Sequence, residues 1–167
     1  QLRFKKALEH IKKNHLDSDL FVISGDITHF GSGEAYKIFL NIIKEEDLPK
    51  KLLPRLIIGN HDNRENFKKN FTTIKTDENG FIQYTETFEN KLFIFLDTNK
   101  PETDSGYFCE HRQRWFEKEL EKGIDKSIYI FMHHNPLALA DENSDKIGLV
   151  QKDKFEEIIL KYNKNIR

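Results

Sequence analysis

Cysteine is nearly absent from this sequence, which contains one, Cys109, among 167 residues. A single cysteine excludes an internal disulfide and favours a reducing compartment. We therefore expect a cytoplasmic protein. The first residue is Gln1 rather than Met, so a targeting signal upstream is not excluded.

Long apolar runs and an excess of one charge are also missing. No run of apolar residues approaches the roughly 20 that a membrane span requires, so we expect no membrane partner. The 27 basic residues nearly balance the 28 acidic residues, which gives a net charge of -1. Without a basic stripe, the chain lacks the electrostatic signature of a nucleic-acid-binding protein, and we expect no nucleic-acid partner. The oligomeric state is left open.

The residues that are present describe a globular protein with a core. Hydrophobic residues make up 37% of the chain, and 14 of them are phenylalanine. The length suits one domain, and no repeat or linker divides it, so residues 1–167 are expected to form a single domain. Apolar residues at helical spacing predict helices around Phe4–Ile11, Tyr36–Ile43, Asn63–Phe71, Trp115–Leu120 and Phe155–Tyr162.

Short apolar runs between these helices predict strands at Leu20–Ile23, Leu56–Ile58 and Ser127–Met132. Two further runs, 81–85 and 92–96, flank Glu89-Asn90 and predict an antiparallel hairpin. Strands that alternate with helices, together with one inserted hairpin, predict an α/β fold with a mixed sheet or two sheets.

Three of the predicted strands end in polar residues that can bind a metal ion or a phosphate. These ends are Ser24-Gly25-Asp26, Gly59-Asn60-His61-Asp62 and His133-His134-Asn135. In open α/β sheets, ligands bind outside the carboxyl ends of the strands, so neighbouring strands would bring these groups together. Carboxylate, amide and imidazole form a mixed oxygen and nitrogen set that suits Mn, Fe or Zn. The glycines before Asp26 and Asn60 allow sharp turns and a close backbone approach.

Each strand end also has a simpler interpretation. Gly-Asp and Gly-Asn are common turn dipeptides, and Asp62 or Asn63 could cap a helix. A pair of histidines could be surface polarity. The coincidence of three such ends in one chain favours a metal centre. His10, His15 and His111 lack this context and are expected to lie on the surface.

The segments "SGDITHFG", "IIGNHDNRENF" and "FMHHNP" resemble three of the five signature blocks of the calcineurin-like metallophosphoesterases. The segment "LDTNKPETDSGYFCEHRQRWFEKEL" is similar to the class III cyclic-nucleotide phosphodiesterase branch. The resemblance implies a four-layer α/β/β/α sandwich of two mixed sheets with two metal ions at the strand ends. It also implies that residues 1–167 are the central part of such a domain, incomplete at both ends. The Asp-x-His block that opens the family pattern and the Gly-His-x-His block that closes it are not found.

The resemblance also implies roles for individual residues. Asp26 would bridge both metal ions, and Asn60 and His133 would bind the second ion, with His134 as the alternative to His133. His61 would be catalytic and would face the phosphoryl group and the leaving oxygen. In several relatives an aspartate three residues after the bridging one orients this histidine. His29 occupies that position here, and Asp62 or Asp97 could take over the orientation of His61.

The function implied is metal-dependent hydrolysis of a phosphodiester, with a small diester or nucleotide, including cyclic nucleotides, as substrate. Two divalent ions, most suitably Mn, Fe or Zn, would share a bridging hydroxide, and a histidine would assist the departure of the leaving group. With the two end blocks absent, we expect this chain to bind at most one ion. Two alternatives stay open, a non-catalytic scaffold that retains the fold and a nuclease of the same superfamily.

Overall fold

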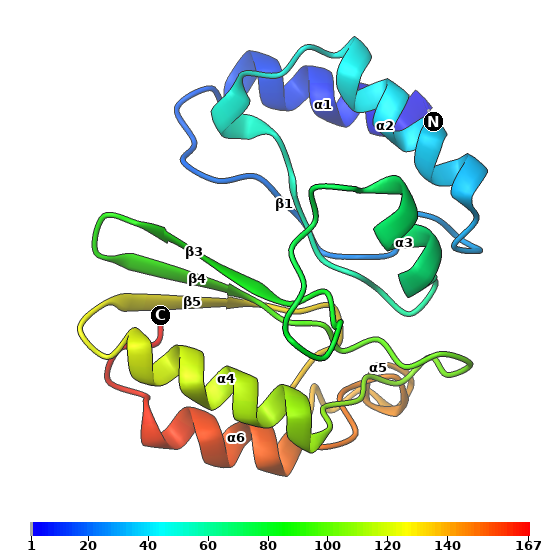
Figure 1. Cartoon of the computed structure of the whole chain (residues 1–167). Helices are drawn as coiled ribbons and strands as arrows, with labels where there is room; N and C mark the ends of the chain where they lie inside the picture. Colours follow the sequence, from blue (N-terminus) through cyan, green and yellow to red (C-terminus); the bar gives the residue numbers. More distant parts are fainter. Residues whose placement is uncertain (1) are drawn as a thin grey trace.

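The structure is a computed structural model that describes residues 2–167. Helices and strands alternate along most of this range (Figure 1). The helices are α1 (Leu2–Asn14), α2 (Gly33–Glu45), α3 (Arg64–Asn70), α4 (Glu110–Lys122), α5 (Glu142–Lys146) and α6 (Lys152–Lys161), with a 3-10 turn, η1, at Lys50–Leu52. The strands are β1 (Val22–Ile23), β2 (Arg55–Leu56), β3 (Tyr84–Phe88), β4 (Lys91–Phe95) and β5 (Ser127–Phe131).

The first sheet pairs β1 with β2 in parallel, and α2 forms the crossover between them. Its strands are two residues long, but the pairing continues through the bonds from Arg55 N to Phe21 O (2.9 Å) and from Ile57 N to Ile23 O (3.0 Å). Helices α1, α2 and α3 cover the outer face of this sheet (Figure 1).

The second sheet has the order β3-β4-β5. Strands β3 and β4 form the predicted antiparallel hairpin, but β3 begins at Tyr84 instead of residue 81 and extends to Phe88. Strands β4 and β5 are parallel and are connected through α4. Helices α4 and α6 cover its outer face (Figure 1). The predicted burial of Phe116 and Leu120 on α4 is confirmed, because both side chains are completely buried.

An aromatic core lies between the two sheets. Phe93 and Phe95 from the second sheet pack there with Ile57, which follows β2. Together with the helical layers, this core confirms the four-layer α/β/β/α arrangement. Mixed strand pairing is found in the second sheet, whereas the described part of the first sheet is a parallel pair.

Two further features concern segments outside the sheets. Helix α5 was not predicted, because Asp141–Lys146 contains no apolar residue whose spacing could reveal a helix. Within residues 2–167, none of the helices has the length and apolar character needed to cross a bilayer.

Candidate metal centre

Side chains from three strand ends meet at the carboxyl edge of both sheets. The Nε2 atom of His133, after β5, lies 2.9 Å from Oδ1 of Asn60, after β2. The same Nε2 lies 3.5 Å from Oδ1 of Asp26, after β1. Ligand atoms that sit about 2.0–2.2 Å from one metal ion are themselves roughly 3.0–3.5 Å apart, so these spacings suit a shared ion. The structure therefore brings together the three residues that the family resemblance predicts as metal ligands.

The hydrogen bonds of His133 show which of its ring atoms is free. Its Nδ1 lies 2.7 Å from the carbonyl oxygen of Ser24. A carbonyl can only accept, so Nδ1 carries a proton, and a ring with no second proton presents a lone pair at Nε2. Nε2 then faces the Asn60 amide oxygen and the Asp26 carboxylate, which are also acceptors. When Nε2 carries no proton, three acceptors converge on one point and form a site that a cation fits.

The two glycines of the motifs allow the strand ends to approach closely. A Cβ atom on Gly25 would lie 2.6 Å from Nδ1 of His133 and 2.8 Å from the backbone of Gly59. A Cβ atom on Gly59 would overlap the carboxylate of Asp26. Asp26 itself has a φ of 51°, a left-handed conformation that is uncommon outside glycine. Its Oδ1 accepts a hydrogen bond from His61 N (3.0 Å), which ties the first strand end to the second.

Asp62, the last residue of the Gly-Asn-His-Asp motif, holds the turn at residues 59–62 in place through its side chain. Its carboxylate accepts hydrogen bonds from Tyr36 Oη (2.9 Å), Gly59 N (3.0 Å), Ile27 N (3.3 Å) and Thr28 N (3.3 Å). The side chain is buried. Burial raises the pKa of Asp62, and the four hydrogen bonds oppose this rise. Asp62 is therefore a structural link between the loops after β1 and β2, not a helix cap.

His61 lines the same cleft as the candidate ligands. Its Nδ1 lies 3.0 Å from the carbonyl oxygen of His29, and the two imidazole rings stack with centroids 4.7 Å apart. The prediction that Asp62 or Asp97 orients His61 is wrong, because Asp62 faces backbone amides and Asp97 is paired with Arg64. The backbone of His29 holds the ring instead, and a residue's identity does not reveal such a contact.

His134 has different surroundings from its neighbour. It is buried, and its Nδ1 lies 2.7 Å from Oγ1 of Thr98. Burial lowers the pKa of His134 to about 4, with a further contribution from His133. A Cβ atom on Gly106 would overlap the His134 ring, so this histidine packs tightly against the loop before α4. Its hydrogen bond to Thr98 and its burial indicate a structural role, and His133 stays our candidate ligand.

A cleft of about 460 Å³ contains the candidate centre. One wall comes from the segment that carries α5, through Leu139, Ser144 and Ile147. Asp104 also lines the cleft and accepts a hydrogen bond from the Asn60 amide at 3.3 Å, which turns the amide oxygen toward His133. This contact could not be predicted from the sequence, because Asp104 lies 44 residues away in a loop.

Within residues 2–167, no group of three or more His, Cys, Asp or Glu side chains is arranged to hold a metal ion. The candidate set contains two residues of those types, and its third donor is the amide oxygen of Asn60. The centre therefore depends on the asparagine, whose oxygen adds a ligand without adding charge.

The sequence and fold of this chain match known proteins over nearly its whole length. A model of the calcineurin-like phosphoesterase family matches residues 2–164. The chain is 33% identical over 156 residues to a probable glycerophosphodiester phosphodiesterase from Arcobacter nitrofigilis, and the match covers 92% of this chain and 55% of that protein. It is 30% identical over 165 residues to a probable cyclic nucleotide phosphodiesterase from Rhodopseudomonas palustris, covering 97% of this chain and 59% of that protein.

A solved structure agrees on the fold. A dimetal phosphatase from Danio rerio superposes with a TM-score of 0.72, covering 97% of this chain and 68% of that one at 14% sequence identity. The chain spans a little over half the length of the two curated relatives. Their names are those of the phosphodiesterase branch that the motifs resemble. With a family model matched from residue 2 to residue 164, the chain belongs to the calcineurin-like phosphoesterase family.

Proposed function

We propose that this chain carries the central part of a metal-dependent phosphodiesterase, in which Asp26, Asn60 and His133 hold a divalent cation. The observation that carries the proposal is the convergence of three acceptor atoms, Asp26 Oδ1, Asn60 Oδ1 and His133 Nε2, around one point. The names of the relatives support hydrolysis of a diester as the reaction. Because the ligands come from both sheets, we propose that the two sheets act as one domain.

The donor set suits a site that must accept an anionic substrate. Divalent cations in such a site polarise the phosphoryl oxygens and lower the pKa of the attacking water. Asp26 contributes one negative charge, whereas Asn60 and the neutral His133 contribute none. A low ligand charge limits the repulsion of a phosphodiester. The mixed oxygen and nitrogen donors favour Mn, Fe or Zn over Ca or Mg.

His61 is placed to act on the substrate rather than on the cation. Its Nδ1 donates to His29 O, so its Nε2 is the ring atom available in the cleft. A protonated Nε2 can donate to the leaving oxygen as negative charge develops there, an effect typically worth about 10²–10⁴-fold in rate. The backbone bond and the stacking on His29 fix the ring, which reduces the loss of entropy when the substrate is aligned.

We propose a small phosphodiester as the substrate class. The relatives are named for cyclic nucleotides and for glycerophosphodiesters, and a P–O bond in a diester is common to both. Among the described residues, one metal position would have Asp26 as its sole ligand. The second position would have three donors, from Asp26, Asn60 and His133. We therefore expect at most one ion per chain of 167 residues and slow turnover.

The test separates metal binding from catalysis with two neighbouring substitutions. Mn²⁺ binding is measured by titration calorimetry and metal analysis, and hydrolysis is measured with bis(p-nitrophenyl) phosphate. We expect Asn60→Ala to abolish Mn²⁺ binding. We expect His61→Ala to keep Mn²⁺ binding and to reduce hydrolysis about 10²–10⁴-fold.

His111→Ala, on the exposed face of α4, is the control and should change neither measurement. The division of roles is wrong if His61→Ala loses the ion and Asn60→Ala retains it. A wild-type chain that binds no Mn²⁺ and hydrolyses no diester would support the non-catalytic scaffold instead.

A further inference from the structure

Asn99 holds the turn that presents Asn60 and His61, although it lies outside the cleft. Its side-chain amide donates to Gly59 O (2.7 Å) and to Asp62 O (3.2 Å), the two carbonyls that flank the pair. Asn99 is 2% exposed and follows β4. A residue from the second sheet therefore fixes a turn that belongs to the first sheet.

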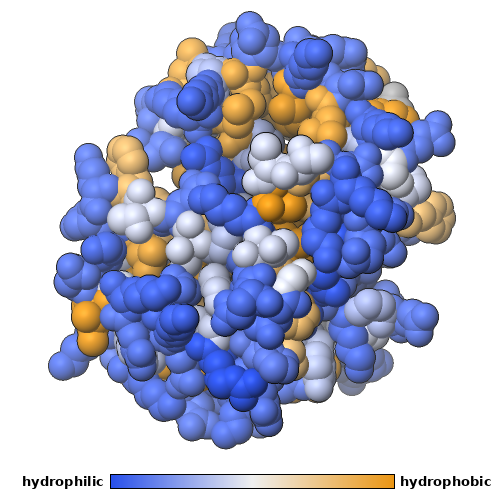
Figure 2. Space-filling view, in the orientation of Figure 1, coloured by the Kyte–Doolittle hydropathy of each residue, from blue (hydrophilic) through white to orange (hydrophobic). Residues whose placement is uncertain are grey.

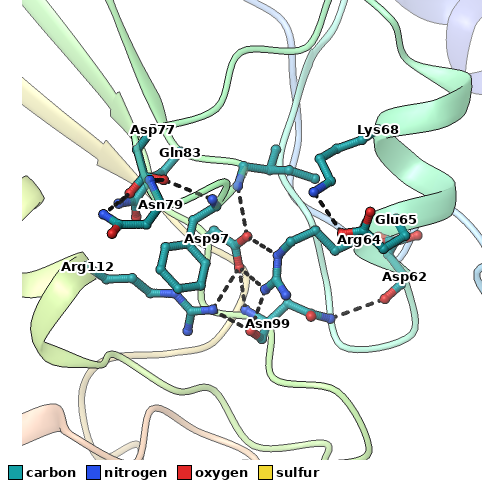
Figure 3. Close-up of polar contacts among 12 residues, drawn as sticks. Asp62, Arg64, Glu65, Lys68, Asp77, Asn79, Gln83, Asp97, Asn99 and Arg112 are labelled. Carbon is teal, nitrogen blue, oxygen red and sulfur yellow. Dashed lines mark hydrogen bonds and ion pairs between the residues drawn. The ribbon is translucent and has the colours of Figure 1, made fainter.

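The backbone of Asn99 is itself fixed by a buried cluster of charges (Figure 3). Its N donates to Asp97 Oδ1 (3.0 Å), and its O accepts from Arg64 Nη2 (2.7 Å) and Arg112 Nη2 (2.8 Å). Asp97 accepts two bonds from Arg64, at 2.8 and 2.9 Å, and one from Ile82 N at 2.9 Å. Asn99 thus has bonds to α3, to α4 and to the end of its own strand.

An aromatic ring gives the cluster further rigidity. The guanidinium of Arg112 lies 4.0 Å from the centroid of the Phe81 ring, and that of Arg64 lies 5.4 Å from it. Asp97 has no exposed surface, and its ion pair with Arg64 is correspondingly unscreened by water. A residue that is held by several hydrogen bonds keeps a fixed position, and it therefore also fixes the position of the groups that its side chain binds.

We propose that Asn99 is a positioning residue for the candidate metal centre. By binding both carbonyls of the Gly59–Asp62 turn, Asn99 sets where the Asn60 oxygen and the His61 ring lie relative to His133. This inference rests on the proposed function, since the position of the turn matters for an ion only if Asn60 binds one. Asn99 touches neither the cation nor the substrate, so its effect passes through Asn60 and His61.

The test compares Asn99→Asp and Asn99→Ala with the wild-type chain. Asn99→Asp keeps the size of the side chain and replaces both N–H donors by a carboxylate, which cannot donate to either carbonyl. Asn99→Ala removes the amide without adding charge. Asn70→Ala is the matched control, because the Asn70 amide also donates to a backbone carbonyl, Asn66 O at 2.8 Å, but within α3 and away from the turn.

Three measurements are made on each protein: Mn²⁺ affinity, urea unfolding and hydrogen exchange of peptides across the chain. We expect both Asn99 variants to fold and to lose about 10–100-fold in Mn²⁺ affinity. Exchange should rise about tenfold in residues 57–66 and stay unchanged in α2 and α4. Asn70→Ala should retain wild-type affinity and wild-type exchange at the turn.

The possible failures are distinguishable. If the folded Asn99 variants bind Mn²⁺ as the wild-type chain does, the inference is overturned while the proposed function stands. If exchange rises across the whole chain, Asn99 only stabilises the fold and the inference is also overturned. If the wild-type chain binds no Mn²⁺, the proposed function fails, and local exchange at residues 57–66 alone decides whether Asn99 holds the turn.

Discussion

The two sheets differ in the amount of regular structure from which their functional residues project. The strands β1 and β2 of the first sheet are two residues long, whereas each strand of the second sheet has five residues. The shorter sheet nevertheless supplies Asp26, Asn60 and His61, and the longer one supplies His133 and Asn99. In the hydropathy view, apolar surface gathers over the helices of the first sheet (Figure 2).

The difference shows how a site can be held by loops. The loops after β1 and β2 extend beyond the hydrogen-bonded strands. In these loops, hydrogen bonds from buried polar side chains take the place of the backbone bonds between paired strands. Asp62 joins these two loops, and Asn99 joins the second loop to the other sheet. The strands of the second sheet are paired over their full length and packed under two helices, and the buried Thr98–His134 hydrogen bond adds to this pairing between the loops after β4 and β5. We call the first sheet with α1, α2 and α3 the first half, and the second sheet with α4 and α6 the second half. Substitutions are therefore expected to act through polar links in the first half and through apolar packing in the second.

The largest effect is expected in the apolar core of the second half. Phe116 is completely buried and stacks on Phe155 with the ring centroids 5.5 Å apart. Phe116→Ala should lower the free energy of unfolding by about 3–5 kcal/mol, because it leaves a cavity that α4 and the sheet cannot close. Urea denaturation measures the change. Phe88→Ala, at a side chain that is 50% exposed, is the control and should cost less than about 0.5 kcal/mol.

If Phe116→Ala left the free energy of unfolding nearly unchanged, the second half would not be held together by its apolar core. The comparison between the halves would then lose its basis.

A smaller effect is expected at the polar anchor of the first half. Asp62→Asn preserves shape but turns one acceptor into a donor that faces N–H or O–H groups, so two of four hydrogen bonds are lost. We expect the free energy of unfolding to fall by about 2 kcal/mol, since relief from burying a charge offsets part of the loss. Urea denaturation again gives the value, and hydrogen exchange should show the loosening at residues 25–28 and 59–62.

Asp17→Asn, at an exposed position before β1, should leave stability and exchange unchanged. If Asp62→Asn matched this control, the loops of the first half would be held by something other than Asp62.

The sequence was sufficient for the elements whose signal is local. Apolar residues at helical spacing located α1, α2, α3, α4 and α6, and the Glu89-Asn90 turn located the hairpin. Residues after the strands indicated the meeting of Asp26 and Asn60, because β1 and β2 are parallel neighbours whose carboxyl ends lie together. His133 reaches them from the second sheet, so its place at the site follows from the packing of the two sheets and not from strand pairing. Periodicity could not locate α5, which exposes every side chain at least in part.

The rest of the site depends on contacts that leave no local pattern. The carbonyl of His29 orients His61, and any residue at position 29 would offer the same oxygen. Asp62 and Asn99 are ordinary polar residues in the sequence, and only burial and distant partners give them their roles. Arg112 lies on the buried face of its helix, where the sequence pattern favours an apolar residue, and its partner Asp97 explains the exception.

The smallest effect is expected where a salt bridge joins the two sheets at their edge. Arg55 of β2 and Glu86 of β3 lie 2.9 Å apart, and their side chains are 26% and 28% exposed. Water screens the pair, so a double-mutant cycle with Arg55→Ala and Glu86→Ala should give a coupling below about 1 kcal/mol that shrinks in high salt. Arg55→Ala alone should cost more than Glu86→Ala, because Arg55 also donates to Lys51 O and Leu53 O. The aromatic core between the sheets, not this pair, should then account for their association. A coupling above about 2 kcal/mol that persists in salt would instead make the edge charges a principal tie between the halves.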